Sequence, residues 1–276
     1  MKYTMKYLAY CMIATVALFS SCSELSKDES ILANTSSELI SDFEGNTYKT
    51  VNIGEQTWMA ENLKVTHFQN GDPILHVTDN YEWFEAGRDR IPARRYYNDD
   101  PSTAEKYGIL YNGFAVSDPR GLAPAGWRVP GDTEWEKLFK ALGGNMIEDS
   151  RVQLKGDSEF AQKFNNRILF YGWTFASKDF SDFLEQENDG ILSIIEASGF
   201  NPVAAGQIDM YGNFYDLDRL TKFWSYPTEK FSFSFPDGSG SEHASITMRS
   251  NPRAARHTIG SAASGKSVRL VKEQVY

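Results

Sequence analysis

Alternating hydrophobic and polar positions near residue 50 predict a β-hairpin. Apolar residues alternate with polar ones over residues 48–53, and a second short run covers residues 56–59. Gly54-Glu55 separates the two runs, and a two-residue loop that contains glycine is typical of a tight turn between antiparallel strands. We therefore expect the folded body to open with two paired strands.

A second alternating region lies in the last quarter of the chain. Phe231, Phe233 and Phe235 alternate with serines, so the three rings are expected on one face of a strand. Pro236-Asp237-Gly238 predicts a turn toward a partner strand over residues 245–249. Rings on one face of a strand either pack in the core or stack on a ligand, and we interpret these three as core.

One helix is well defined by its periodicity and its end signals. Thr133 can cap the amide of Glu136 while the Glu136 side chain reaches back, and Gly143-Gly144 predict the C-terminal end. A second helix is expected within residues 179–197, interrupted near Asn188-Asp189-Gly190. The buried face of the first helix is predicted from four apolar residues at helical spacing, which are Trp135, Leu138, Phe139 and Leu142.

The first 21 residues have the layout of an export signal. Lys2 and Lys6 precede an apolar run over residues 8–19, which is shorter than the roughly 20 residues that a bilayer-spanning helix needs. Small residues then lead directly into Cys22, as in a lipobox, although Phe19 is a looser fit than the usual aliphatic residue. We predict cleavage before Cys22 and lipid attachment to that cysteine, so the membrane is the expected partner of the N-terminus. The alternative is an ordinary signal peptide that leaves an incidental thiol.

Cysteine usage favours the lipid anchor. Cys11 is the only other cysteine and is lost with the signal, so Cys22 has no second thiol with which to pair. The acidic residues 23–29 resemble the surface-export tag of Bacteroides-type lipoproteins, and a solvated linker is the alternative. We therefore expect an outer-membrane lipoprotein exposed at the cell surface, with periplasmic retention as the alternative. The expected parts are a signal peptide at 1–21, a lipidated cysteine with a flexible acidic linker at 22–40, and one body at 41–276.

The charge balance argues against nucleic acid as a partner. The chain has 28 basic and 37 acidic residues, and loss of Lys2 and Lys6 with the signal leaves 26 against 37, a net charge of −11. Nucleic-acid phosphates require a basic face, which this composition does not favour. Four clustered arginines are interpreted as salt-bridging or packing residues instead, namely Arg88, Arg90, Arg94 and Arg95.

Several sequence blocks resemble one known domain family. The block at residues 51–63, VNIGEQTWMAENL, is similar to the opening of the Fibrobacter succinogenes major paralogous domain family. The later blocks follow in the order of that family, as YGILYN (107–112), PAGWRVP (124–130) with Glu134-Trp135, SGFN (198–201), FWS (223–225) and VRLVK (268–272). Together the blocks span residues 45 to 273, so the resemblance covers almost the whole predicted body.

Residues 128–136 and 268–272 also resemble parts of the formylglycine-generating and C-type-lectin-like superfamily. This resemblance implies an α+β, C-type-lectin-like domain with a mostly antiparallel twisted sheet, one or two helices and long irregular loops. Family members commonly carry cysteines where this chain has Ala123 and Leu270, so the resemblance implies that an apolar pair replaces a disulfide worth roughly 2 to 5 kcal/mol. The tryptophans of the shared blocks are expected in the core, and they are Trp58, Trp127, Trp135 and Trp224.

The sequence contains few arrangements that catalysis or metal binding requires. Formylglycine-generating activity uses reactive cysteines, and only Cys22 would remain after processing, so we expect no enzyme activity and no cofactor. The four histidines lack the spacing of a zinc site or a catalytic triad. Loop oxygens could instead hold calcium, with solvated turn residues as the alternative, and the candidates are Asn98, Asp99, Asp100, Asp209, Asp216 and Asp218.

Recognition is the function class that these exclusions leave. The first hypothesis is a non-catalytic surface binding or adhesion lipoprotein with polysaccharide as its ligand. The second is a structural or assembly component of an envelope or fimbria-like complex that recognises protein, and a glycosidase ranks third. Loop aromatics could contact a glycan, with rim packing as the alternative, and the first candidates are Trp83, Tyr97 and Tyr211.

Overall fold

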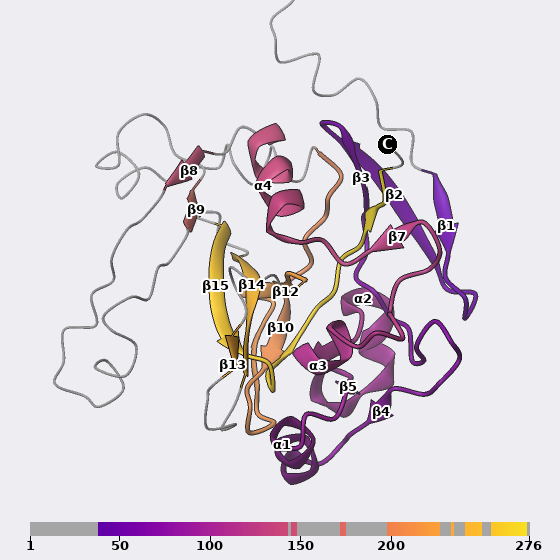
Figure 1. Ribbon diagram of the computed structural model, residues 1–276, viewed down its shortest axis with the longest axis vertical. Helices are drawn as coiled ribbons and strands as arrows, with labels where there is room; N and C mark the ends of the chain where they lie inside the picture. Colours follow the sequence, from indigo (N-terminus) through magenta and orange to yellow (C-terminus); the bar gives the residue numbers. More distant parts are fainter. Residues whose placement is uncertain are drawn as a thin grey trace, which may run out of the picture. The chain divides into compact units, whose positions relative to one another are not determined.

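The computed structural model of the chain (Figure 1) describes the greater part of the expected body. The described residues are 38–142, 145–147, 172–174, 198–226, 233–234, 241–249 and 255–274, with side chains described for 38–142, 198–226 and 260–274. All of them belong to one compact unit, Thr35–Tyr276. The export signal, Cys22 and the helix expected within residues 179–197 lie outside the described residues.

The first sheet joins the two ends of the body. Its hairpin is the one expected from the sequence, because Ile53 pairs with Gln56 across a loop in which Gly54 has a φ of 59°. The strand nearest the C-terminus lies between two strands that precede it by more than a hundred residues, and all neighbours are antiparallel. The order is β1 (Leu39–Ser41), β2 (Thr47–Ile53), β3 (Gln56–Met59), β17 (Val271–Lys272) and β7 (Trp127–Arg128).

The second sheet is larger and is also mostly antiparallel. Only the β4–β5 and β10–β12 pairs are parallel among its described ladders. Its order is β4 (Leu75–His76), β5 (Ala93–Arg95), β6 (Leu110–Asn112), β16 (Gly265–Lys266), β10 (Ala205–Ile208), β12 (Leu220–Trp224), β14 (Ser241–Arg249), β15 (Ala255–Ser261), β9 (Gly172–Thr174) and β8 (Asn145–Ile147). In addition, β11 (Phe214–Leu217) pairs with β10, and β13 (Phe233–Ser234) pairs with β14.

The β13–β14 pair confirms the second hairpin predicted from the sequence. Phe233 lies opposite Glu242, so the partner strand begins at Ser241 rather than at residue 245. The placement of the three phenylalanine rings stays a prediction, since their side chains lie outside the described ones.

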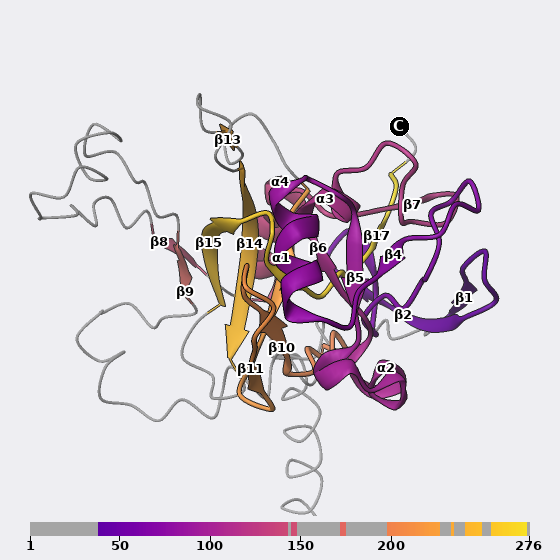
Figure 2. The same ribbon diagram turned by 90° about the horizontal axis from the view of Figure 1, so that it is seen from below.

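The helices are short and pack on the sheets (Figures 1 and 2). The described helices are α1 (Asn80–Arg88), α2 (Ala104–Tyr107), α3 (Gly113–Val116) and α4 (Asp132–Ala141), with two 3₁₀ turns, η1 (Tyr97–Asp99) and η2 (Pro101–Thr103). In the described part of the chain, no helix has the length and apolarity needed to cross a membrane. The protein is therefore a sheet-rich α+β fold with few helices and a curled, mostly antiparallel sheet, as the sequence led us to expect at this level.

Helix α4 begins earlier than its sequence pattern predicted. Its N-cap is Gly131, and Thr133 lies inside the first turn. Glu134, rather than Glu136, reaches back to accept a hydrogen bond from the Gly131 amide at 2.9 Å. The predicted Thr133 cap is therefore wrong, because Arg128 holds Glu134 in a bidentate pair and so fixes the helix start at Gly131.

The buried face of α4 is the predicted one and packs between the two sheets. Trp135 contacts Trp58 of β3 at 4.9 Å between ring centroids and stacks on Phe223 of β12 at 5.7 Å. The four tryptophans of the family blocks are all buried, which confirms their expected place in the core. Ala123 and Leu270 contact one hydrophobic cluster, so the two apolar replacements share a part of the core.

A buried arginine ties the C-terminal segment to two loops. The Arg269 guanidinium donates to the Asn62 side chain and to the backbone carbonyls of Met59, Phe200 and Asn201. It also lies 4.7 Å from the centre of the Phe200 ring. Because carbonyl oxygens and a side-chain amide satisfy its donors, this cation is stabilised in the core by neutral groups.

Candidate functional site

Helix α1 and the β10–β11 hairpin present a group of exposed aromatic rings. Tyr81 and Phe84 are three residues apart on α1 and therefore lie on one face of it. The Phe84 ring stacks on Tyr211 of the hairpin loop, with 6.0 Å between centroids and 14° between planes. Tyr81 and Tyr211 are 67% and 59% exposed. We call Tyr81, Phe84, Tyr211 and the neighbouring Tyr215 the tyrosine platform.

Arg95 holds the two parts of the tyrosine platform together. Its guanidinium donates to Asn80 at the start of α1 and to the carbonyl of Gly212 in the hairpin, both at 3.0 Å. It also forms a two-point ion pair with Asp99 at 2.7 Å for each bond. The same arginine was predicted to have a salt-bridging role, and the structure confirms it. The platform is therefore fixed by a buried charged group beneath it.

The structure separates the three residues that the sequence suggested as ligand contacts. Tyr211 is exposed on the platform, whereas Trp83 is 1% exposed and donates its indole N–H to the Asp209 carbonyl at 3.1 Å. Tyr97 is 7% exposed and packs on Phe214 at 5.0 Å. The expectation that Trp83 and Tyr97 lie at the surface of ligand-binding loops is therefore corrected. Trp83 is instead on the inner face of α1, where its ring fills the core.

The acidic residues considered for calcium make protein contacts instead of converging on one point. Asp99 pairs with Arg95, and Asp100 caps the η2 turn by accepting from the Ser102 amide. Asp209 closes the hairpin loop by accepting from the amides of Tyr211 and Asn213, each at 2.9 Å. Asp216 accepts from Gln207, and Asp218 accepts from Tyr107. Over the described ranges, no three acidic, histidine or cysteine residues come together as a metal site would require.

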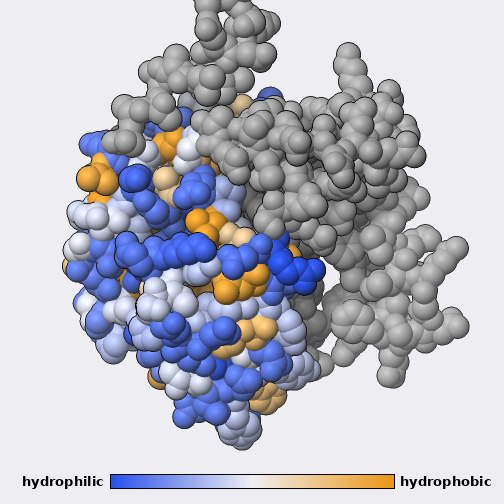
Figure 3. Space-filling view, turned by 180° about the vertical axis from the view of Figure 1, so that it is seen from behind, coloured by the Kyte–Doolittle hydropathy of each residue, from blue (hydrophilic) through white to orange (hydrophobic). Residues whose placement is uncertain are grey.

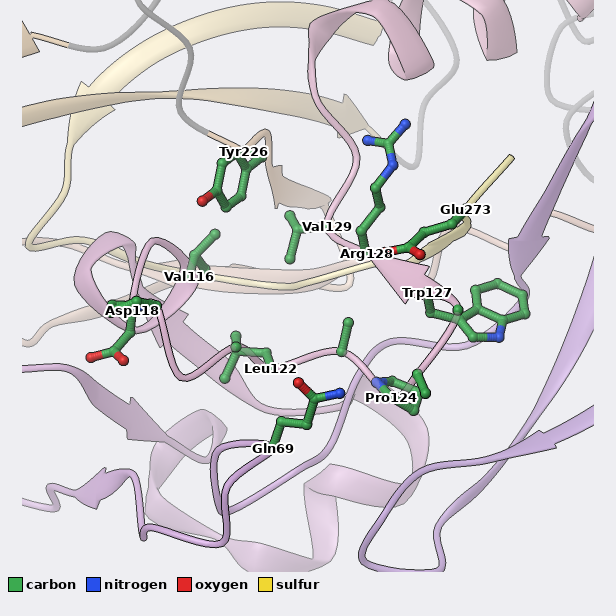
Figure 4. Close-up of a pocket in the computed structure, with 15 residues that line it drawn as sticks. Gln69, Val116, Asp118, Leu122, Pro124, Trp127, Arg128, Val129, Tyr226 and Glu273 are labelled. Atoms are coloured by element: carbon green, nitrogen blue, oxygen red, sulfur yellow. The ribbon is translucent and has the colours of Figure 1, made fainter. Parts of the chain in front are cut away.

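A pocket lies beside β7 and has a volume of about 460 Å³ (Figure 4). Its apolar part is made of buried residues from the segment between α3 and α4, including Val116, Leu122 and Val129. Figure 4 shows Tyr226 across the pocket from Gln69, with Asp118 at one end and Glu273 near the other. We call this hollow the β7 pocket. Its lining combines apolar side chains with hydrogen-bonding groups.

Backbone hydrogen bonds hold the rim of the β7 pocket in place. The amide of Gln69 donates to Gly121 at 2.9 Å, and the amide of Tyr226 donates to Pro130 at 2.8 Å. The amide of Glu273, just after β17, donates to Gly126 at 2.8 Å. Three distant parts of the chain are thus fastened to one segment, so the rim side chains are presented from a fixed backbone.

Ion pairs set the charge of the rim. Arg120 forms two 2.8 Å hydrogen bonds with Asp118, which hold the pKa of that carboxyl below its usual range. Burial acts to raise the pKa of Glu134, but hydrogen bonds from Arg128 and from the Gly131 amide outweigh it and lower the pKa overall. Both carboxyl groups are therefore ionised at neutral pH.

The residues of the β7 pocket were not recognised as a site from the sequence. The segment from Pro124 to Pro130 belongs to a family block, and the sequence predicts packing in the core for its Trp127. Tyr226 and Glu273 lie far from it in the chain and reach the pocket only through the pairing of β7 with β17 and the hydrogen bond to Pro130. The sequence signal that could have indicated this pocket is the block at residues 124–130, which contains a tryptophan, two prolines and a glycine.

Where the described residues are visible in Figure 3, they form no broad apolar area on that face. Hydrophobic residues of the described part appear there as small patches separated by hydrophilic residues. Scattered patches of this size are common on monomeric proteins. The pocket and the platform are therefore the more informative features of the surface.

The described part of the chain is a sheet-rich α+β domain with a pocket lined by loops beside β7. The chain matches the model of the Fibrobacter succinogenes major domain over residues 51–272, and it belongs to that family. The match confirms the family resemblance stated from the sequence blocks. No curated protein and no solved structure matches the chain.

Proposed function

We propose that the protein is a non-catalytic, lipid-anchored glycan-binding protein of the outer membrane, with its body exposed at the cell surface. The observation that carries the proposal is the β7 pocket, in which an exposed tyrosine ring faces planar polar side chains over an apolar floor. Sugars offer both C–H faces that stack on aromatic rings and hydroxyls that bond to amides and carboxylates. The pocket volume of about 460 Å³ suits a short stretch of oligosaccharide.

The contacts of Tyr226 and Gln69 support this assignment. Tyr226 is 47% exposed, so one face of its ring is available to a ligand. Gln69 lies across the pocket and has both an acceptor and a donor in its side chain. We propose that Tyr226 stacks on a sugar ring while Gln69 bonds to its hydroxyls.

The states of Asp118 in the pocket and of Glu134 beside it support binding rather than glycoside hydrolysis by these two groups. A glycosidase needs one carboxylic acid whose pKa is raised so that it can donate a proton. The pKa values of Asp118 and Glu134 are instead lowered by their arginine partners. Neither group is suited to be that acid.

The lipid anchor at Cys22 and the C-type-lectin-like relationship belong to the same proposal. Their support is the lipobox-like sequence before Cys22 and the mostly antiparallel sheet with a few helices and long loops. An anchored body with an acidic charge balance is expected to bind no nucleic acid.

The decisive experiment compares glycan binding by variants of the lipidated full-length chain in detergent, each of which lacks one aromatic ring. On a glycan array and in insoluble-polysaccharide pull-downs, Tyr226→Ala is expected to weaken binding about tenfold, because it removes the stacking ring. Phe43→Ala is the matched control, since Phe43 is an exposed ring outside the β7 pocket. Equal binding by Tyr226→Ala and the unchanged protein would remove the pocket from the proposal.

A second candidate function is recognition of protein in an envelope or fimbria-like assembly, and the tyrosine platform favours it. Exposed, rigidly held tyrosines are typical of protein-binding surfaces. Tyr211→Ala tests this alternative in the same experiment. Absence of glycan binding, together with loss of a cross-linked envelope complex in Tyr211→Ala, would replace the glycan proposal with the assembly function.

A further inference from the structure

We infer that the β7 pocket selects neutral glycans and disfavours anionic ones. This inference rests on the proposed function and specifies the ligand class of the same site. It comes from the distribution of charge around the pocket, which is a property separate from the stacking ring.

The ionisable groups in and next to the pocket carry a net negative charge. The charged residues that line the pocket, together with the residues joined to them by ion pairs, comprise four carboxylates and two guanidinium groups, which leaves a net charge of −2 for this set. The carboxylates are Asp72, Asp118, Glu134 and Glu273, and the guanidinium groups are Arg120 and Arg128.

The two arginines are already engaged by protein carboxylates. Arg128 binds Glu134 in a bidentate pair, with bonds of 2.7 and 3.0 Å. Arg120 binds Asp118 at two points and also reaches Asp72 at 3.1 Å. An anionic ligand would have to compete with these carboxylates for the two guanidinium groups. The N–H donors with which each arginine could bind such a ligand at two points already bond to protein carboxylates.

Glu273 adds a further negative charge to the lining of the pocket. Its amide donates to the Gly126 carbonyl, which places the side chain at the rim of the pocket. A neutral hydroxyl can donate a hydrogen bond to the Glu273 carboxylate, whereas a sugar carboxylate is repelled by it.

The repulsion is modest in size because the site is open to water. Two like charges about 4 Å apart in water repel by an amount that corresponds to a change in affinity of about fivefold. Salt weakens such an interaction over distances of about 10 Å at 0.1 M ionic strength. The preference is therefore expected to shrink as salt is added.

The experiment measures the affinity of the detergent-solubilised full-length chain for matched glycan pairs. The probes are glucan, mannan and galactan oligosaccharides, each beside a form in which the C6 hydroxymethyl groups have been oxidised to carboxylates. For any of these glycans that binds, the neutral form is expected to bind about fivefold tighter than its oxidised form at low ionic strength. The ratio is expected to fall to about twofold in 0.5 M salt.

Glu273→Gln supplies the test of the residue itself. The change removes one charge while keeping the shape of the side chain, and it is expected to lower the neutral-to-anionic ratio about twofold or more. Glu82→Gln, an equal change at an exposed position of α1, is the control and is expected to leave the ratio unchanged. Thermal unfolding of both variants shows that each remains folded.

The outcomes separate this inference from the proposed function. Oxidised glycans that bind as tightly as their neutral partners, or a ratio that Glu273→Gln does not change, would overturn the charge selection and leave glycan binding intact. A panel in which neither form of any glycan binds would overturn the proposed function and this inference together.

Discussion

The β7 pocket and the tyrosine platform are built by opposite means. The pocket is a hollow whose apolar floor belongs to the core and whose rim is held by backbone hydrogen bonds and ion pairs. The platform is a projecting surface of exposed rings that stand over the buried Arg95. The first region is a concave hollow, and the second is an exposed surface without enclosure.

The comparison distinguishes two properties of a surface, namely how rigidly it is held and how selectively it can bind. A rim of charged groups can discriminate between ligands by charge, whereas stacked tyrosines mainly supply contact area. The platform should therefore depend on its supporting arginine for its stability, and the pocket should depend on its rim charges for its selectivity. The predictions below test that distinction.

The largest effect is expected from removing the support beneath the platform. Arg95→Leu leaves the Asp99 carboxylate and the Asn80 and Gly212 acceptors without their donor, so the free energy of unfolding should fall by roughly 3 to 5 kcal/mol. Chemical denaturation measures the change. Arg88→Leu, which removes an exposed ion pair of the same helix region, should leave the free energy of unfolding almost unchanged, because solvent screens such a pair. Equal losses in the two variants would mean that Arg95 is not the support of the platform.

A glycine in each region gives a matched test of crowding. A Cβ at Gly212, which has a φ of 88°, would lie 2.7 Å from Asn80 Cα, so Gly212→Ala should destabilise the protein by roughly 1 to 3 kcal/mol. Gly126 in the pocket rim has a φ of 78° but no atom within 4 Å of a Cβ, so Gly126→Ala should lose only about 1 kcal/mol. Denaturant midpoints of the two variants show how much stability is lost through steric crowding of the added Cβ and how much through the positive φ angle alone. A larger loss at Gly126 would contradict the close packing of the platform.

The smallest effect concerns the rim charges and depends on pH. The pKa of Glu134 is lower in the folded protein than its ordinary value of 4.5, so its contribution to stability is complete above pH 4.5 and is lost as the pH falls through the folded pKa. Glu134→Gln should therefore lower the unfolding free energy by about 1 kcal/mol at pH 7, and by less at pH 3. Urea denaturation at both values measures the difference. A difference that stays constant with pH would show that ionisation of Glu134 contributes nothing.

Local patterns predicted the elements that depend on neighbouring residues. The hairpin around Gly54 and the buried face of α4 were both predicted from short sequence windows, since a strand alternates and a helix repeats every 3.6 residues. The start of α4 was not predicted, because the ion pair of Glu134 with Arg128 overrides the intrinsic capping preference of Thr133.

The site itself could not be predicted from local pattern. Trp83 looks like a loop aromatic in sequence, yet it lies two residues from Tyr81 on α1, which puts the two rings on opposite faces, Trp83 inward and Tyr81 outward. Tyr226 and Glu273 become neighbours of the Pro124–Pro130 segment only through long-range pairing. Such proximity is a property of the assembled sheet, so a single sequence contains little direct sign of it.

The position of β17 has a consequence for the order in which the protein folds. This strand follows β3 and β7 by more than a hundred residues, but it lies between them, and the adjoining Arg269 fastens two distant loops. The first sheet therefore cannot close, and the β7 pocket cannot acquire Glu273, until β17 has joined its two neighbours. The sheet thus depends on pairing between segments that are more than a hundred residues apart in the chain, so we expect it to form late and slowly during folding.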